Sequence, residues 1–91
     1  MPVIAKVICA ADGSATPHDG RYIVRWNPHT EAGVLECETT DLLKRAKRWR
    51  DAGEVMRERG AVSRVQPYRP WDRMLNRPLL GIAIEVTKCS S

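Results

Sequence analysis

Phenylalanine is absent from this chain of 91 residues, and the only aromatic residues are three tryptophans and two tyrosines. A small domain without phenylalanine has few large side chains with which to fill a core, so each aromatic residue is a candidate for the core or for a binding surface. Trp26 and Trp49 each lie on a face that we expect to point inward. We therefore predict that both lie in the core.

Long apolar runs are also missing. No segment has the length that a membrane-spanning helix requires, and Lys6 interrupts the only apolar stretch near Met1. We therefore expect a cytoplasmic protein without a membrane segment or a secretory signal. A chain of this length forms one domain, residues 1–91, and buries only roughly 60–65% of its unfolded surface.

Cysteine is scarce, and its three positions, Cys9, Cys37 and Cys89, are widely spaced. An odd number without close pairs argues against a disulfide framework and against a zinc site. We expect reduced thiols, with Cys9 and Cys37 held in strands and Cys89 reacting faster because it lies near the chain end.

Catalytic residue types are sparse. The two histidines, His18 and His29, lie among turn-forming residues, and no nucleophile is placed to pair with them. Asp12, His18 and Asp19 are the nearest approach to a metal-binding set, and ordinary turn chemistry accounts for them. We predict no catalytic residue, no metal and no cofactor.

Alternating hydrophobic residues predict strands at four places. On the second strand, the alternation places Tyr22, Val24 and Trp26 toward the core and Ile23 on the opposite face. Turn-forming residues after the second strand predict an antiparallel hairpin with the third. The predicted strands are Val3 to Cys9, Arg21 to Trp26, Val34 to Thr39 and Leu80 to Val86.

Two short helices are predicted between the third and fourth strands. The first follows the capping residue Thr40 and places Leu42, Ala46 and Trp49 on one stripe. The second begins with a capping-box-like start at Asp51 and ends before Gly60. The expected fold is a single small α+β domain in which both helices pack on one face of an antiparallel sheet of three to four strands.

Positive charge is unevenly distributed along the chain. From residue 44 to residue 77 there are eleven Lys or Arg against four acids, a net charge of +7, whereas the rest carries −3. This basic face could grip phosphates or an acidic protein, or it could simply be solvated. The candidate binding residues in its first part are Lys44, Arg45, Lys47, Arg48 and Arg50.

Residues 64–78 form a second candidate, a Pro- and Arg-rich arm that we expect to be extended and partly polyproline-like. Aromatic and arginine side chains dominate protein interfaces and also stack on unpaired bases. An alternative is that Trp71 and Met74 pin the arm to the core. The candidate binding residues of the arm are Tyr68, Arg69, Trp71 and Arg73.

Three isoleucines, Ile4, Ile8 and Ile23, are predicted on the sheet face opposite the core. An exposed apolar patch of this kind would suit a homodimer or another partner, unless the arm or a terminus covers it.

Four short motifs resemble small uncharacterised proteins of bacterial phages and prophages. They are Arg21 to Val24, Ala46 to Trp49, Asp51 to Met56 and Asn76 to Leu79. The resemblance implies a virus-derived accessory protein without catalytic residues that acts in the cytoplasm of a bacterial host cell. It favours a non-enzymatic protein that binds a host protein or nucleoprotein complex, and it suggests inhibition of a host defence such as CRISPR. The alternative function is a nucleic-acid-binding accessory protein that uses the same basic helix and arm.

Overall fold

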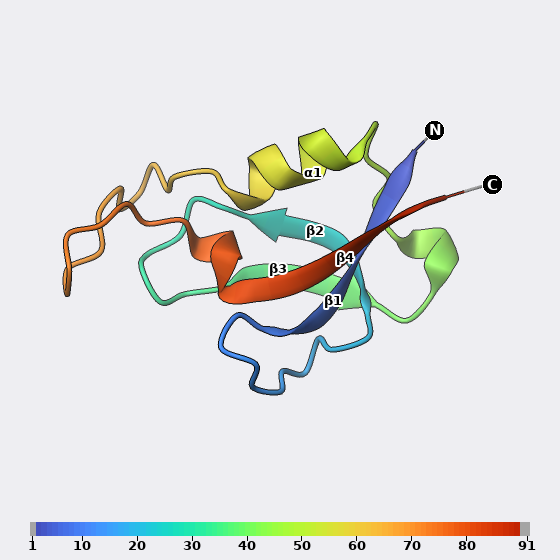
Figure 1. The fold of residues 1–91 in the computed structure, drawn as a ribbon, viewed down its shortest axis with the longest axis horizontal. Coiled ribbons are helices and arrows are strands. Elements are labelled where there is room, and N and C mark those ends of the chain that lie inside the picture. The colour runs from blue at the N-terminus through green and yellow to red at the C-terminus, as the bar shows by residue number, and fades with distance from the viewer. Residues whose placement is uncertain (1, 90–91) are drawn as a thin grey trace.

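The computed structural model describes residues 2–89 as a four-stranded antiparallel sheet with one α-helix and two 3-10 turns (Figure 1). The strand order is β3-β2-β1-β4, and the α+β class and the antiparallel sheet are as predicted. The elements are β1 (Val3–Ala10), β2 (Tyr22–Asn27), β3 (Glu36–Thr40), η1 (Leu43–Arg45), α1 (Ala52–Arg59), η2 (Pro78–Gly81) and β4 (Ile82–Lys88).

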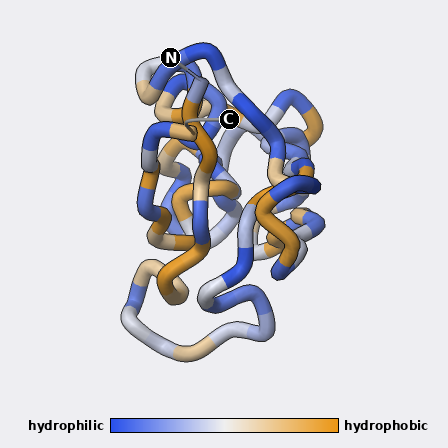
Figure 2. The backbone as a smooth tube through the Cα atoms, turned by 90° about the vertical axis from the view of Figure 1, so that its right-hand side faces the viewer, coloured by the Kyte–Doolittle hydropathy of each residue, from blue (hydrophilic) through white to orange (hydrophobic). Residues whose placement is uncertain are grey.

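The core lies between the sheet and α1. Val3, Ala5 and Val7 share one face of β1 and pack with Val55 of α1, which is fully buried. Polar and apolar positions are interleaved along residues 2–89, as Figure 2 shows in a view from the end at which both termini lie. The remaining buried members of this core are Ile23, Trp49 and Ile82.

Trp49 lies in the core, as predicted, and only 1% of its surface is exposed. Trp26 is half-buried and packs against the same cluster, with 5.5 Å between the centroids of the two indole rings. A tilted pair at this distance adds to the stabilisation that burial alone provides.

An irregularity in β2 overturns the predicted faces of this strand. The pairing with β3 shifts between Ile23 and Arg25, so Ile23 and Trp26 both meet the core, although an unbroken strand would place them on opposite faces. Ile23 is fully buried, contrary to the expectation that it faces outward.

The first predicted helix is wrong. Only Leu43–Arg45 forms a 3-10 turn, and Leu42, which we expected on the buried stripe, is exposed. Backbone pairing with the sheet explains the difference, because Trp49 and Val3 exchange two N–H···O bonds of 2.9 Å and the N–H of Lys47 donates to the carbonyl of Ile23 at 2.9 Å. The backbone of residues 47–49 therefore hydrogen-bonds to Val3 of β1 and to Ile23 of β2. These groups are not available for the hydrogen bonds of a helix.

The second predicted helix is confirmed as α1. The Asp51 side chain accepts the N–H of Glu54 at 2.9 Å, and Gly60 follows the last helical residue, as the capping pattern indicates. The backbone N–H of Glu54 lowers the pKa of the Asp51 carboxyl. No helix within the described residues combines the length and the apolar character needed to cross a membrane.

The predicted isoleucine patch does not exist. Ile23 is in the main core, and Ile4 is buried in a second small cluster with Ala46 and Cys89 beneath the η1 turn. Only Ile8 is exposed, so a homodimer through Ile4, Ile8 and Ile23 is ruled out.

The burial of the cysteines reverses the order of exposure on which the expected reactivity rests. Cys89 is buried, whereas Cys9 and Cys37 are partly exposed, so position near the chain end does not make Cys89 the most accessible thiol. Burial raises the pKa of the Cys37 thiol, which slows its reaction further at neutral pH.

Candidate binding surface at the arm

The predicted binding residues lie at opposite ends of the molecule. Lys44 to Arg50 occupy the end near the termini, and residues 64–78 form the loop that projects from the other end (Figure 1). The longest dimension of the protein is 43 Å. The two sets therefore form two surfaces and do not make one continuous basic face.

Part of the positive charge in the basic segment is neutralised locally. Lys47 Nζ lies 3.7 Å from Glu58 Oε1 and 5.1 Å from the centroid of the Trp49 ring. Arg50 Nε lies 3.5 Å from Asp51 Oδ2 and 3.9 Å from the carboxylate of Glu54. Lys44, Arg45 and Arg48 are exposed, so this end offers a smaller basic surface than the charge count indicates.

Glu58 joins this end of the molecule to α1. It accepts the indole N–H of Trp26 at 2.9 Å. The buried indole N–H of Trp49 also approaches the carboxylate, but its geometry falls short of a hydrogen bond. Desolvation raises the pKa of Glu58, but the two indoles and Lys47 outweigh it, so the pKa lies below its ordinary value.

Buried polar groups hold the base of the arm to the loop between β2 and β3. The Asn76 amide, only 2% exposed, donates to the carbonyls of Thr30 at 3.1 Å and Gln66 at 2.8 Å. The buried Ser63 hydroxyl donates to the same Thr30 carbonyl at 2.7 Å. The Gln66 side chain accepts the N–H of Ala32 at 2.8 Å. These bonds fix both strands of the arm where they leave the domain.

Beyond this base the arm doubles back on itself. Tyr68 and Leu75 form a β-bridge, and the Arg69 N–H donates to the Met74 carbonyl at 2.8 Å. Arg73 closes the turn with a positive φ of 60°, a conformation that non-glycine residues adopt uncommonly. The arm is thus a hairpin-like loop whose two halves support each other.

Asp72 stabilises the turn of the arm. Its carboxylate accepts the N–H of Met74 at 3.0 Å and forms a bidentate contact with Arg69, one branch of which, from Nε to Oδ1, measures 3.0 Å. The backbone N–H of Met74 and the Arg69 guanidinium lower the pKa of the Asp72 carboxyl.

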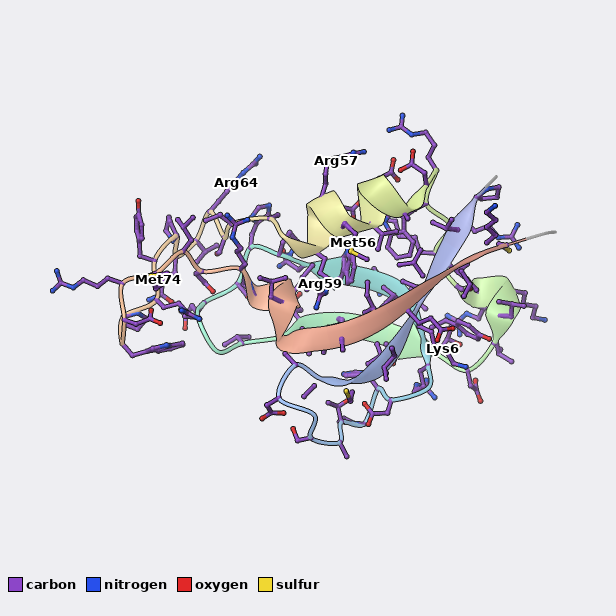
Figure 3. All side chains as sticks on the ribbon, in the orientation of Figure 1. Lys6, Met56, Arg57, Arg59, Arg64 and Met74 are labelled. Carbon is purple, nitrogen blue, oxygen red and sulfur yellow. The ribbon has the colours of Figure 1, made fainter. Side chains whose placement is uncertain are left out.

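Large side chains at the end of the arm face solvent. Trp71 is 62% exposed, and Tyr68 and Met74 are each 60% exposed. Trp71 and Met74 therefore do not pin the arm to the core. Figure 3 shows Met74 at this end of the molecule, away from the body of the domain. Exposed aromatic, methionine and arginine side chains on an anchored loop are typical of an interaction surface.

A groove of about 450 Å³ lies beside the arm. Its apolar walls come from Trp71 and Leu75 of the arm, Val34 and Leu35 before β3, and Leu80 of η2. Arg69 and Arg77 also line it, and no acidic residue does. The groove can therefore accept an apolar side chain of a partner, next to a negative charge on that partner.

Several residues of this surface were not identified from the sequence. Val34 and Leu80 were assigned to strands, and nothing in the sequence marks Ser63 and Asn76 as partners across the arm. Figure 3 shows Arg57 and Arg64 pointing away from the body of the protein on the same side. In the sequence, only the excess of arginine after residue 44 indicated that Arg57 and Arg64 could belong to a binding surface.

Within residues 2–89, no three His, Cys, Asp or Glu side chains gather in a way that could hold a metal ion. The loop between β1 and β2 shows turn chemistry instead, because hydrogen bonds from Ser14 lower the pKa of Asp12 and hydrogen bonds from Thr16 lower the pKa of Asp19. His18 Nδ1 lies 2.8 Å from the hydroxyl of Thr39.

Comparisons with protein-family models, with curated proteins and with solved structures gave no match.

Proposed function

We propose that this chain is a non-enzymatic interaction protein of phage type that binds a host protein or nucleoprotein complex in the bacterial cytoplasm. The arm is the principal binding surface in this proposal, with Tyr68, Arg69, Trp71 and Arg73 as its contact residues. The basic segment at the other end, which includes Lys44 and Arg45, has a secondary role. Inhibition of a host defence such as CRISPR is one outcome of such binding.

The exposure of Trp71 on an anchored arm carries the proposal. Leaving this ring in water forgoes the roughly 1.5–3 kcal/mol that burial of a large apolar side chain provides. The hydrogen bonds at Ser63 and Asn76 nevertheless hold the arm in a defined shape. A preorganised loop loses little conformational entropy on binding, and its exposed ring can then be buried by the partner.

The partner surface should be acidic and partly apolar. The arm has four arginines and one acid, and Asp72 is already engaged by Arg69. Arg64 and Arg73 are exposed. Complementary charge on the partner would increase the rate of association, and burial of Trp71 would provide most of the affinity.

Affinity capture from nuclease-treated lysate of a bacterial host, with the wild-type chain and its variants as bait, tests the proposal. The wild-type chain should retain a partner, and Trp71→Ala and Arg73→Glu should each reduce its recovery at least tenfold. The paired change Lys44→Glu and Arg45→Glu is the matched control, since it removes exposed cations at the opposite end and should reduce recovery far less. Equal recovery with Trp71→Ala and wild type would contradict a role for the arm.

Nucleic-acid binding is the second candidate function. Arg57 of α1 and Arg64 at the start of the arm project on the same side of the protein, and exposed rings with arginines suit unpaired bases. Binding would then disappear on nuclease treatment. A gel shift with a generic duplex or single strand should weaken steeply as salt rises. Binding releases condensed cations from the phosphates, and this release contributes less to the affinity when the surrounding salt concentration is high. The absence of a shift at low salt excludes this function.

A further inference from the structure

The outer edge of β4 is open for backbone pairing. β4 is the last strand of the sheet, and Cys89 N donates to Pro2 O at 2.8 Å on its paired side. Hydrogen-bonding direction alternates along an antiparallel strand, so Thr87 and Glu85 also face β1. The N–H and C=O groups of the alternate residues must point away from the sheet. These residues are Ile84, Val86 and Lys88.

The pairing of β1 supports this assignment independently. Val3 and Val7 stand opposite Lys88 and Ile84, and both direct their backbone groups away from β4, Val3 to Trp49 and Val7 to the start of β2. Residues directly opposite in such a ladder behave alike. The hydrogen bonds of Val3 and Val7 on the far side of β1 therefore show that the backbone N–H and C=O groups of Lys88 and Ile84 point away from β1.

Among residues 2–89, a side chain caps only the first outward position of β4. Arg59 of α1, labelled in Figure 3, donates two hydrogen bonds of 3.1 and 2.7 Å to the carbonyl of Ile82. This leaves a three-position edge from Ile84 to Lys88. The other edge strand, β3, is shorter, and the exposed acids Glu36 and Glu38 lie along it. β4 also carries exposed charges, Glu85 and Lys88, so the two edges differ in length and not in charge.

The core is also incomplete at the β4 edge. Ile84 and Val86 pack against the main core cluster but are only partly buried. A strand placed beside β4 would cover both side chains and satisfy the outward backbone groups in the same step.

We propose that β4 pairs antiparallel with β4 of a second copy of this chain, with Val86 opposite Val86 on the two-fold axis. In this register Ile84 meets Lys88 of the other copy, so each open position pairs with an open position and about six backbone hydrogen bonds form. The two sheets join into one, and both α1 helices lie on the same side.

Neighbouring registers are poorer. A shift that centres the axis on Glu85 puts like charges directly opposite each other and requires the carbonyl of Ile82, which Arg59 already occupies. A shift that centres it on Thr87 places Ile84 beyond the end of the partner's β4 at Lys88, so fewer strand residues pair. The register centred on Val86 places Glu85 opposite Thr87, while Lys6 of the same copy stays opposite Glu85 on β1. This complementarity of β4 with itself favours a second copy over an unrelated strand.

The interface uses no residue of the arm, so it is independent of the proposed function. Sedimentation over a wide concentration range should show a monomer–dimer equilibrium of the wild-type chain. Hydrogen exchange should then slow with protein concentration at the amides of Ile84, Val86 and Lys88. The amides of Glu85 and Thr87 are an internal control, because they already bond to β1 at every concentration.

A matched pair of variants separates the backbone from the side chain. Lys88→Pro removes one outward N–H from each copy and should weaken the dimer about tenfold or more, whereas Lys88→Ala keeps the N–H and should weaken it much less. Circular dichroism and thermal unfolding verify that both variants remain folded. A wild-type chain that stays monomeric at millimolar concentration overturns the proposal, and so does a dimer that Lys88→Pro and Lys88→Ala affect equally.

Discussion

The two ends of the molecule have similar compositions and different structures. Each combines arginines with a tryptophan, Trp49 in the basic segment and Trp71 in the arm. At the first end the backbone enters the sheet and the ring enters the core, whereas at the second end the backbone folds on itself and the ring stays in solvent.

Backbone hydrogen bonding accounts for this difference. The segment that carries Trp49 fills the gap where β1 and β2 separate, and its pairing with Val3 and Ile23 fixes the direction of the ring. The backbone of the arm pairs with itself through Tyr68 and Leu75, and the buried polar anchors of the arm lie at its base. Composition therefore indicates which residues are available for binding, and the backbone partners decide which of them remain exposed.

The largest expected effect separates the two tryptophans. Trp49→Ala should reduce the free energy of unfolding by about 3–5 kcal/mol, because it leaves a cavity among Val3, Ile23 and Val55. Trp71→Ala should change it by less than about 0.5 kcal/mol, as is usual for exposed positions. Urea denaturation followed by circular dichroism measures both. Comparable losses of stability would show that the arm ring is part of the packed structure after all.

An intermediate effect is expected at the base of the arm. Asn76→Ala leaves the buried carbonyls of Thr30 and Gln66 without one donor and should cost about 2–3 kcal/mol. Hydrogen exchange should accelerate at the amides of Arg69 and Ser63, both of which bond within the arm and its base. Unchanged exchange there would mean that the arm keeps its shape without Asn76, and the proposed preorganisation would then fail.

Much of the fold could be predicted from the sequence, because four strands and α1 follow local rules. The alternation along β1 and β4 and the capping residues around α1 depend only on neighbours in the chain. The first predicted helix failed for the opposite reason. Leu42, Ala46 and Trp49 have helical spacing, but the distant residues Val3 and Ile23 compete for the backbone of this segment.

The candidate site was predictable in composition and not in geometry. Tyr68, Trp71 and their neighbouring arginines stand out in the sequence, and the structure exposes the two rings. The groove depends on Val34, which lies far from the arm in the chain, and on Leu80, which follows the arm in η2 but was assigned to a strand. The irregularity that turns Ile23 inward is a property of the pairing between β2 and β3 and has no marker in the sequence.

The smallest expected effect concerns pH, and it distinguishes the two ends again. Glu58 has a pKa below its ordinary value of 4.5, so its contribution to stability is present above that value and is lost as pH falls through the lower pKa of the folded state. Glu58→Gln should therefore reduce the acid sensitivity of unfolding below about pH 5. Thermal unfolding across this range, compared with the wild type, measures the difference.

Trp26→Phe is the matched control for this prediction, since it keeps a ring against Trp49 but removes the N–H that Glu58 accepts. It should reduce the acid sensitivity by a smaller amount, because Lys47 and Trp49 still favour the charged carboxylate. The anchors of the arm, Ser63 and Asn76, carry no titratable group. Acidification should therefore lower the hydrogen-exchange protection factors of the Lys47 and Trp49 amides before it lowers that of the Ser63 amide. If the arm loosened first, Glu58 would not be the group that couples pH to stability.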